Sequence, residues 1–331
     1  MMIRLVLMAI LSLALLAPAR AETNELHLGV QRGMTYLVFA VIEHERMIEK
    51  QAAALGIPDL KVTYARFSGG PAMTDALIAG SIDTAATGIP SFLGLWAKGR
   101  GRLAVKGLSS YGSVPFGLVT RNPAVKTLAD LSDKDRIATP GVKSSTQAIL
   151  LAMAAEKLYG LAHADHFDAM TVTRGHPDAM AALLGGTEIN SHFSIPPYMQ
   201  AELRAPGVHL VTTTEEILGG TMSSGTIFLT VKFAEDNPKV MAAYYAALKE
   251  AAAYITADPH RAAEAYLAVS GEKTALAEIE EIIRIPGTTF DVAPHGVTAV
   301  AGFLHRTGVI AAEPKDWKEL YLPFVHGEPG S

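Results

Sequence analysis

The chain contains no cysteine, so disulfide bonds, thiolate metal sites and a cysteine nucleophile are excluded together. It has only two tryptophans, Trp96 and Trp317, which argues against a sugar-binding platform of stacked indole rings. Basic residues number 28 against 33 acidic ones and form no stripe along the sequence, so we expect no nucleic-acid partner.

Apolar runs long enough to cross a membrane are also missing. The run over residues 5–17 is shorter than the roughly 20 residues that a spanning helix needs. Arg4 precedes this run, and Ala19-Arg20-Ala21 follows it with the small-x-small form that signal peptidase recognises. We therefore predict a signal peptide over residues 1–21 and a mature periplasmic chain from Glu22. No cysteine follows the run, so no lipid anchor is expected.

What the sequence does contain is one short unit used twice. Residues 70–80 read GPAMTDALIAG, and residues 176–186 read HPDAMAALLGG. Each copy is followed at the same spacing by an Ile-Pro-x-aromatic sequence, at residues 89–92 and 195–198. Each copy predicts a short helix, a glycine stop, a strand and a turn. The repetition indicates two similar lobes with a cleft between them, an architecture suited to capturing a small molecule.

Hydrophobic patterning and turn residues predict the order of strands and helices. Strands are expected over residues 26–30, 61–67, 81–86, 104–108, 115–120, 136–139, 169–173, 208–213 and 226–231. Helices are expected over residues 35–55, 72–79 and 146–160, and the chain is mostly helical from 237 to about 324. The β-α-β-α-β order at the start favours a parallel sheet covered by helices.

The predicted fold class is therefore α/β, with two lobes and a hinge. We expect lobe one to hold residues 22–115 plus 225–331, and lobe two to hold residues 116–224. The chain then crosses between the lobes twice, and two crossings suit closure around a ligand.

Turns rich in glycine, serine and threonine recur where a strand ends and a helix begins. The clearest are Gly33-Met34-Thr35, Ser68-Gly69-Gly70, Thr87-Gly88-Ile89-Pro90-Ser91 and Lys143-Ser144-Ser145-Thr146. A helix N-terminus carries unpaired N–H groups and a partial positive charge, so several of them in one cleft hold a small anion without a formal cation. Taken singly, each turn is equally an ordinary helix cap. The repeat places residues 87–91 and 193–196 on facing walls.

Motifs for catalysis or metal binding are weak. The segment His163-Ala164-Asp165-His166-Phe167-Asp168 has ligand-type side chains, but it follows a glycine helix stop and is expected to be a surface loop. Ser270-Gly271-Glu272-Lys273 matches a Ser-x-x-Lys pattern without its partner motifs. We expect no enzyme activity, no cofactor and no metal.

The chain resembles the substrate-binding proteins of ABC importers. The resemblance rests on Gly29-Val30-Gln31, Ser68-Gly69-Gly70-Pro71, Ala79-Gly80-Ser81-Ile82-Asp83 and Thr87-Gly88, in that order after a signal peptide, and covers essentially the whole mature chain. It is most similar to the nitrate/sulfonate/taurine branch, which shares its fold with thiamine-pyrimidine precursor-binding proteins.

The resemblance implies a type II periplasmic-binding fold and delivery of a solute to a permease and ATPase complex in the inner membrane. It also implies ligand contacts from the turns near residues 31–35, 68–70, 87–91, 144–146 and 190–193. The candidate ligand-binding residues are Gln31, Thr35, Ser68, Gly69, Gly70, Thr87, Ile89, Ser91, Ser144, Ser145, Thr146, Asn190, His192 and Phe193.

The identity of the solute stays open at this point. Sulfonate binders of the family often carry an aromatic residue in the first turn, whereas here Gln31 to Tyr36 reads QRGMTY. His192 either bonds the ligand or lies at the edge of the core. A small anion such as an alkanesulfonate, taurine or nitrate is favoured, and a thiamine pyrimidine precursor, an aromatic acid or a carboxylic acid is the alternative. A pyrimidine-synthase-like enzyme is a weaker alternative, and the sequence does not distinguish a solute sensor from a transport receptor.

Overall fold

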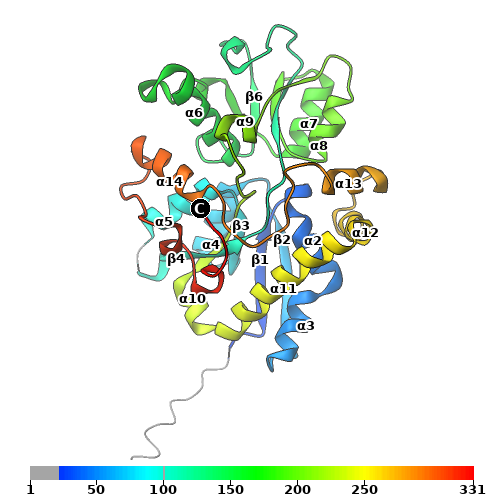
Figure 1. Ribbon diagram of the computed structural model, residues 1–331, viewed down its shortest axis with the longest axis vertical. Helices are drawn as coiled ribbons and strands as arrows, with labels where there is room; N and C mark the ends of the chain where they lie inside the picture. The colour runs from blue at the N-terminus through cyan, green and yellow to red at the C-terminus, as the bar shows by residue number, and fades with distance from the viewer. Residues whose placement is uncertain (1–21, 100) are drawn as a thin grey trace, which may run out of the picture.

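The computed structural model describes residues 22–99 and 101–331, and the predicted signal peptide lies outside them. Figure 1 shows two α/β lobes, one above the other. The first sheet contains β1 (Glu25–Val30), β2 (Lys61–Arg66), β3 (Thr84–Thr87), β4 (Val105–Ser110) and β10 (Thr226–Thr230), in the order β2-β1-β3-β10-β4. The second contains β5 (Gly117–Thr120), β6 (Ile137–Thr139), β7 (Thr171–Thr173), β8 (Ser191–Ser194) and β9 (His209–Thr213), in the order β7-β6-β8-β5-β9.

The strands β1, β2 and β3 are parallel, as the sequence predicted, but each sheet also contains one strand of opposite direction. Strand β10 is antiparallel to β3 and β4, and β5 is antiparallel to β8 and β9. Both strands directly follow a crossing from the other lobe. They enter their sheets without the crossover helix that a parallel neighbour requires, so they can run the opposite way.

The helices before the second sheet are α2 (Leu37–Glu45), α3 (Met47–Ala54), α4 (Gly70–Ala79) and α5 (Ile89–Lys98). The prediction of one helix over residues 35–55 is wrong, because Arg46 adopts a left-handed conformation (φ 53°) between α2 and α3. Its N–H bonds back to the Glu43 carbonyl and ends α2 there. The chain can then begin a second helix along a new axis.

The second sheet carries α6 (Thr146–Tyr159), α7 (His176–Gly185), α8 (Tyr198–Leu203) and α9 (Thr214–Leu218). The two copies of the repeat form α4 and α7, and each helix has proline in its first turn. Each copy also ends at a left-handed glycine, Gly80 with φ 73° and Gly186 with φ 65°. The same local sequence therefore produces the same helix in both lobes.

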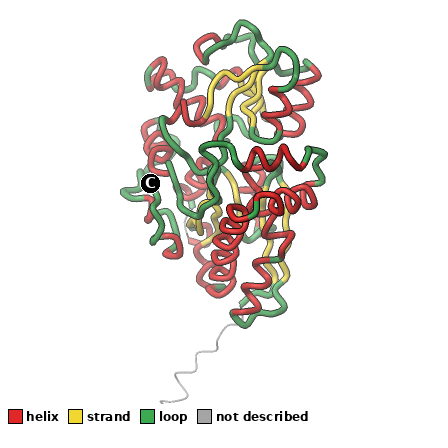
Figure 2. Tube along the Cα trace, turned by 45° about the vertical axis from the view of Figure 1, so that its right-hand side comes forward, coloured by secondary structure: helices red, strands yellow, loops and turns green. Residues whose placement is uncertain are grey.

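The C-terminal third forms α10 (Val231–Asp236), α11 (Pro238–Ala257), α12 (Pro259–Ser270), α13 (Leu276–Ile283) and α14 (Val297–Arg306). Short 3₁₀ turns lie at Met34–Tyr36, Gly101–Leu103, Leu128–Asp130, Leu161–His163, Asp168–Met170, Trp317–Glu319 and Pro323–Val325. The long helix α11 lies against α2 and α3 across one face of the first sheet (Figures 1 and 2).

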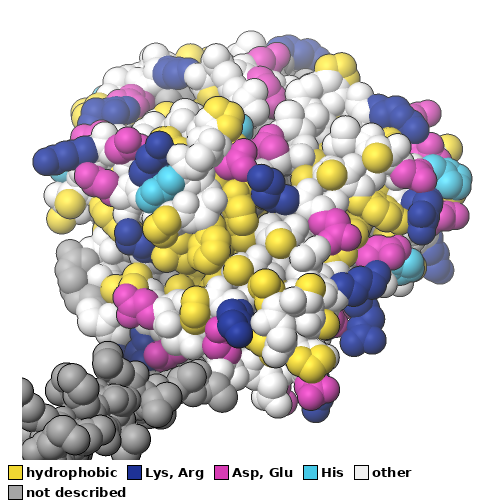
Figure 3. Space-filling view, turned by 60° about the horizontal axis from the view of Figure 1, so that its bottom comes forward, with side chains coloured by type: hydrophobic (Ala, Val, Ile, Leu, Met, Phe, Trp, Pro, Cys, Tyr) yellow, Lys and Arg dark blue, Asp and Glu magenta, His cyan; other side chains and the backbone are white. Residues whose placement is uncertain are grey.

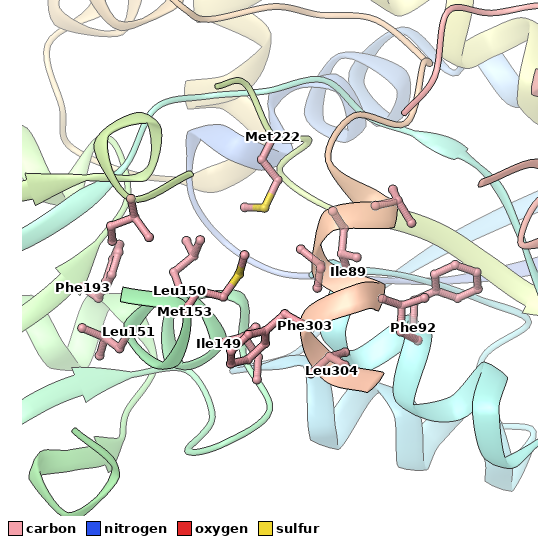
Figure 4. Close-up of a cluster of buried hydrophobic side chains, with 14 of the residues drawn as sticks. Ile89, Phe92, Ile149, Leu150, Leu151, Met153, Phe193, Met222, Phe303 and Leu304 are labelled. Carbon is pink, nitrogen blue, oxygen red and sulfur yellow. The ribbon is translucent and has the colours of Figure 1, made fainter. Parts of the chain in front are cut away.

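One hydrophobic core continues from lobe to lobe. Figure 4 shows Phe303 and Leu304 of α14 between the side chains of α5 and those of α6. Phe92, Leu150, Phe193 and Phe303 are all almost fully buried in this cluster. On one side of the molecule the lobes are therefore joined by apolar contacts as well as by the connecting segments.

The two connecting segments are hydrogen-bonded to each other. The Ser224 N–H donates to the Gly112 carbonyl at 2.8 Å, and the Val114 N–H donates to Ser224 Oγ at 3.1 Å. A third segment joins them, because Ser113 and Thr289 exchange backbone hydrogen bonds of 2.9 and 2.8 Å. These contacts define the hinge region, and the residue boundaries proposed for the lobes stay a prediction.

The surface carries charges of both signs. On the face in Figure 3, basic and acidic side chains are interspersed around an area of apolar side chains. Within residues 22–99 and 101–331, no helix combines the length and apolarity needed to span a bilayer.

Candidate functional site: a cavity between the lobes

A partly open cavity lies between the two lobes, beside the carboxyl ends of strands from both sheets, with about 420 Å³ of empty space including its open mouth. Gln31 follows β1, Thr87 ends β3, Pro140 follows β6 and Ile195 follows β8. The remaining lining residues are Thr35, Tyr36, Gly70, Gly88, Ser91, Phe116, Ser145, Thr146, Gln147, His176 and Ser224. Both lobes thus contribute walls to one cavity.

Helix N-termini from both lobes converge on this cavity. Gly70 begins α4, Gly88 precedes α5, Ser145 caps α6 and His176 begins α7. Each terminus offers N–H groups outside the helical ladder and about half a positive charge. No Lys, Arg, Asp or Glu is among the described residues that line the cavity. The site is therefore electrostatically suited to a small anion without a formal cation.

Tyrosine and glutamine side chains form the lobe-one wall. Gln31 Nε2 donates to the Tyr36 hydroxyl at 2.7 Å and to Thr87 Oγ1 at 3.1 Å. The Tyr111 hydroxyl donates to that of Tyr36 at 3.3 Å. Burial raises the pKa of Tyr36, so this hydroxyl stays protonated at physiological pH. The wall is a preassembled set of neutral donors and acceptors.

The two adjacent hydroxyls at the start of α6 have different roles. Ser145 Oγ accepts from the Ala148 N–H at 3.2 Å, which is the ordinary capping contact. Thr146 Oγ1 is buried and has no hydrogen-bond partner within the described part of the chain. Because an unpaired buried hydroxyl is unfavourable, the Thr146 hydroxyl is the clearest unsatisfied side-chain group among the residues that line the cavity.

The lobes are closed on each other around the cavity. The Met34 N–H donates to the Pro196 carbonyl at 2.8 Å, and Ser91 Oγ donates to the Ser144 carbonyl at 3.4 Å. The backbone at Gly69 lies against the Pro140 carbonyl so closely that a Cβ there would overlap it. Close approach of backbone is one of the few roles that only glycine fills.

Behind the lobe-two wall lies a chain of buried ionisable side chains. His176 Nδ1 is 2.9 Å from His192 Nε2, and His192 Nδ1 is 2.6 Å from Glu202 Oε1. His192 and Glu202 are completely buried, and His176 is 5% exposed at the cavity. Burial, followed by the neighbouring His192, holds the pKa of His176 well below its usual range. His176 therefore faces the cavity as a neutral imidazole.

Half of the candidate residues from the sequence line the cavity, and the other half do not. The residues that line it are Gln31, Thr35, Gly70, Thr87, Ser91, Ser145 and Thr146. In lobe one, Gly69 lies against Pro140, and Ile89 is fully buried in the core. Ser144 presents its carbonyl to Ser91 instead of to the cavity. Ser68 lines a second, more open pocket.

The segment Asn190 to Phe193 is not brought to the cavity wall. Asn190 precedes β8, and its amide donates to Asp135 Oδ1 at 2.8 Å. Phe193 packs in the core with its ring centroid 5.9 Å from that of Phe116. His192 lies behind His176. The reason is that β8 borders the cavity only at its carboxyl end, where its last residue, Ser194, is followed by the lining residue Ile195.

The candidate residues from the sequence did not include the lining residues Tyr36, Gly88, Phe116, Pro140, Gln147, His176, Ile195 and Ser224, although Gly88 and Ile195 lie in the two turns that the repeat placed on facing walls. Two of them carry a signal that was available. His176 occupies the same position in the second copy of the repeat as Gly70 in the first, and Ile195 matches Ile89. Applying the repeat symmetry to Gly70 and Ile89 in the list of candidate residues would have added both.

The more open pocket adjoins the cavity. It has about 710 Å³ of empty space and shares Gln31 and His176 with the inner cavity. Arg32 and Arg66 line it from lobe one. Among the described residues, no group of three or more His, Asp or Glu side chains is placed to hold a metal ion, and the segment 163–168 follows α6 at the surface.

Comparisons with known proteins agree with this architecture. The sequence profile of the NMT1-like family matches residues 19–270. A protein of Escherichia coli strain K12 named as an aliphatic sulfonates-binding protein is 28% identical over 252 residues, covering 75% of this chain and 73% of its own.

Two solved structures show the same arrangement of lobes. The alkanesulfonate-binding protein of Xanthomonas axonopodis pv. citri, bound to MOPS, has a TM-score of 0.67 at 22% identity, covering 89% of this chain and 96% of its own. The periplasmic nitrate-binding protein of Synechocystis PCC 6803 has a TM-score of 0.66 at 15% identity, covering 90% of this chain and 85% of its own. The periplasmic-binding fold predicted from the sequence is confirmed.

Proposed function

Because this chain belongs to the NMT1-like family, we propose that it is a periplasmic solute receptor that holds a small oxyanion between its two lobes. The family resemblance seen in the sequence is confirmed by the profile match. The relatives described above are binding proteins by name, and we assign no reaction to this chain.

The observation that carries the proposal is the set of helix N-termini around the unpaired Thr146 hydroxyl. Converging N–H groups and helix dipoles stabilise negative charge. Among the described residues that line the cavity there is no Asp or Glu whose negative charge would repel an anion. An oxyanion would accept a hydrogen bond from the Thr146 hydroxyl, which has no protein partner within the described residues. A hydrogen bond to a charged group contributes about 1.5–3 kcal/mol.

Within this class we favour a sulfonate, taurine-like or nitrate-like solute. The relatives named for sulfonates and nitrate support this choice, as does a lining of small polar side chains and helix N-termini. A pyrimidine precursor, an aromatic acid or a carboxylic acid is tested in the same experiment. Two cations lie near the site but do not line the inner cavity: Arg32 lines the adjoining pocket, and Lys143 forms an ion pair with Asp168 at 3.1 Å.

The physiological partner that we propose is an ABC permease with its ATPase in the inner membrane. Closure joins surfaces of both lobes, as in the contact of Met34 with Pro196, so the permease can distinguish the closed receptor from an open one. Uptake of the identified solute can be measured in a strain that lacks the protein and in the same strain after the protein is produced again. Restored uptake indicates transport, and unchanged uptake indicates sensing.

A thermal-shift screen of protein freed from carried-over ligand tests the proposal. The panel contains alkanesulfonates, taurine, nitrate, carboxylates, amino acids and thiamine precursors. Saturation at a hundredfold excess over the dissociation constant adds about 2.7 kcal/mol of stability, which gives a clear rise in melting temperature. We expect a rise with an oxyanion and about tenfold weaker binding in Thr87→Ala and Ser145→Ala. A rise only with a neutral ring would refute the anion assignment.

A further inference from the structure

The chain of buried side chains behind His176 connects the cavity with the interior of lobe two. His176 begins α7, His192 lies in β8 and Glu202 lies in α8, so three separate elements position them. The contacts of 2.9 and 2.6 Å are both short enough to be hydrogen bonds. Each contact holds one hydrogen, and the number of hydrogens on the His192–Glu202 pair decides the direction of the bond between His192 and His176.

Two arrangements of hydrogens satisfy both contacts. If Glu202 and His192 share two hydrogens, the pair is neutral overall, and His192 Nε2–H donates to His176 Nδ1. This holds whether the pair is a carboxylate with an imidazolium or a carboxylic acid with a neutral imidazole. Neutral His176 then carries its own hydrogen on Nε2. If the pair has one hydrogen only, it lies on His192 Nδ1 and is donated to the Glu202 carboxylate. His192 Nε2 then accepts from His176 Nδ1–H, and His176 Nε2 becomes an acceptor.

Burial favours the neutral arrangement. His192 and Glu202 have no exposed surface, and Glu202 Oε2 has no hydrogen-bond partner among the described residues. A net negative charge at this position would lack both water and a second donor. The effective penalty for an unpaired buried ion is several kcal/mol, whereas the neutral pair avoids it.

The other charged and titratable groups around His176 lie on its outer side. Asp178, Arg32 and Arg66 line the adjoining pocket that His176 borders. The ring of Tyr198 stacks on His176 at 6.1 Å and 12°, and its hydroxyl donates to Glu272. None of these groups forms a hydrogen bond with His192 or Glu202 among the contacts of the described residues.

We propose that Glu202 and His192 are positioning residues that hold His176 Nε2–H as a donor to the ligand. The inference rests on the proposed function, because it explains how a neutral imidazole recognises an anionic oxygen. Gln147 Nε2 lies 3.4 Å from His176 Nε2. Amide orientation is assigned from the hydrogen-bond network, and the arrangement with hydrogen on His176 Nε2 requires the Gln147 amide to turn its oxygen toward the ring. With a donor at Nε2 the cavity selects ligand oxygens, and with an acceptor there it would select amines or hydroxyls.

The first test needs no ligand. Long-range proton–nitrogen correlation spectra of isotope-labelled protein report which ring nitrogen of His176 carries hydrogen, with Gln147 and His192 intact. We expect hydrogen on Nε2 and a bare Nδ1. A His176 with hydrogen on Nδ1 overturns the proposal, whether or not any solute binds. Because this measurement uses no solute, its result tests the position of the hydrogen on His176 independently of whether the proposed function is correct.

The second test uses two substitutions of the same residue. In Glu202→Gln the amide can still donate to His192 Nδ1, so the neutral arrangement and the affinity should be retained within about threefold. In Glu202→Met no donor or acceptor remains, and the affinity should fall at least about tenfold. Ethanesulfonate is the probe, because it stays ionised throughout the accessible pH range and any protonation effect therefore belongs to the protein.

The matched control is Glu188→Gln, since Glu188 is exposed and pairs with Arg174 away from the cavity. It should leave the affinity unchanged. If Glu202→Met binds ethanesulfonate as tightly as the natural protein does, the positioning role is refuted. If that variant fails to fold, the spectrum of the natural protein decides the proposal by itself.

Discussion

Gly88 of lobe one and Thr146 of lobe two meet so closely that a Cβ at position 88 would overlap Thr146 Oγ1. Gly88 has φ −55°, a conformation open to any residue. Its glycine is therefore required by the neighbouring lobe and not by its own backbone. Since both residues line the cavity, this contact links closure of the lobes directly to the solute site.

The substitution Gly88→Ala should keep the lobes from closing fully. We expect at least about tenfold weaker solute binding and a larger radius of gyration in solution scattering with solute present. Gly94→Ala is the matched control, because a Cβ at position 94 of α5 meets open space and alanine favours the helix. Equal affinity in Gly88→Ala and the natural protein would contradict the role assigned to this contact.

Thr146→Val should separate binding from stability. Valine has the same shape as threonine, so the substitution removes only a hydroxyl that is buried without a protein partner among the described residues. The free energy of unfolding without solute should stay constant or rise slightly, while affinity for an oxyanion falls about ten- to hundredfold. Chemical denaturation and calorimetry measure the two effects. A large loss of stability would mean that the hydroxyl serves the fold.

A latch outside the cavity should control solute release. Glu272, between α12 and α13, accepts from the Tyr198 hydroxyl of lobe two at 2.6 Å and from the Tyr266 hydroxyl at 2.9 Å. Tyr198→Phe removes the contact between the lobes, and we expect about five- to tenfold faster dissociation in stopped-flow experiments. Tyr266→Phe is the control, because Tyr266 lies in α12 and donates to the same carboxylate without joining the two lobes. This substitution should leave the dissociation rate unchanged. Equal rates in all three proteins would refute the latch.

The pH dependence of stability should contain a contribution from His176. Burial and the neighbouring His192 hold its pKa well below the ordinary value of 6.5 in the folded protein. The unfolded chain therefore binds more protons below about pH 6.5, and the free energy of unfolding falls as the pH decreases through that value. Above it the contribution is constant.

The variant His176→Gln tests this contribution by removing the titrating group. We expect a smaller loss of stability between about pH 7 and pH 5 than in the natural protein, measured by urea denaturation. His163→Gln is the control, because His163 is exposed in the segment after α6. An identical pH profile in His176→Gln and the natural protein would contradict the assigned cause.

Local chemistry made part of the site predictable. Serine is a preferred helix-capping residue, and Ser145 stands immediately before an apolar helical run. In the structure its Oγ does cap α6. The repeated spacing of proline, glycine and Ile-Pro identified the turns at Gly70 and Thr87 as parts of one unit. These inferences needed only the geometry of one turn or the comparison of two similar segments.

Other site residues were beyond sequence reasoning because they depend on strand direction and on distant contacts. Asn190 stands close to the second Ile-Pro turn in the chain, yet it lies at the opposite end of β8 from the cavity. Phe116 reaches the cavity from a crossing segment, and Ser224 reaches it from the other. Sequence proximity does not specify which end of a strand a residue occupies relative to a second lobe.

The sequence by itself determined the two-lobed α/β class and the repeated helix and turn units. It also showed that small polar residues recur at helix starts. Each of these follows from local periodicity and turn chemistry. Only the tertiary structure decided which of these helix starts meet, that Gly88 lies against Thr146, and that His192 and Glu202 stand behind His176. These relationships join residues far apart in the chain, and they depend on how the lobes close and on which groups lose contact with water.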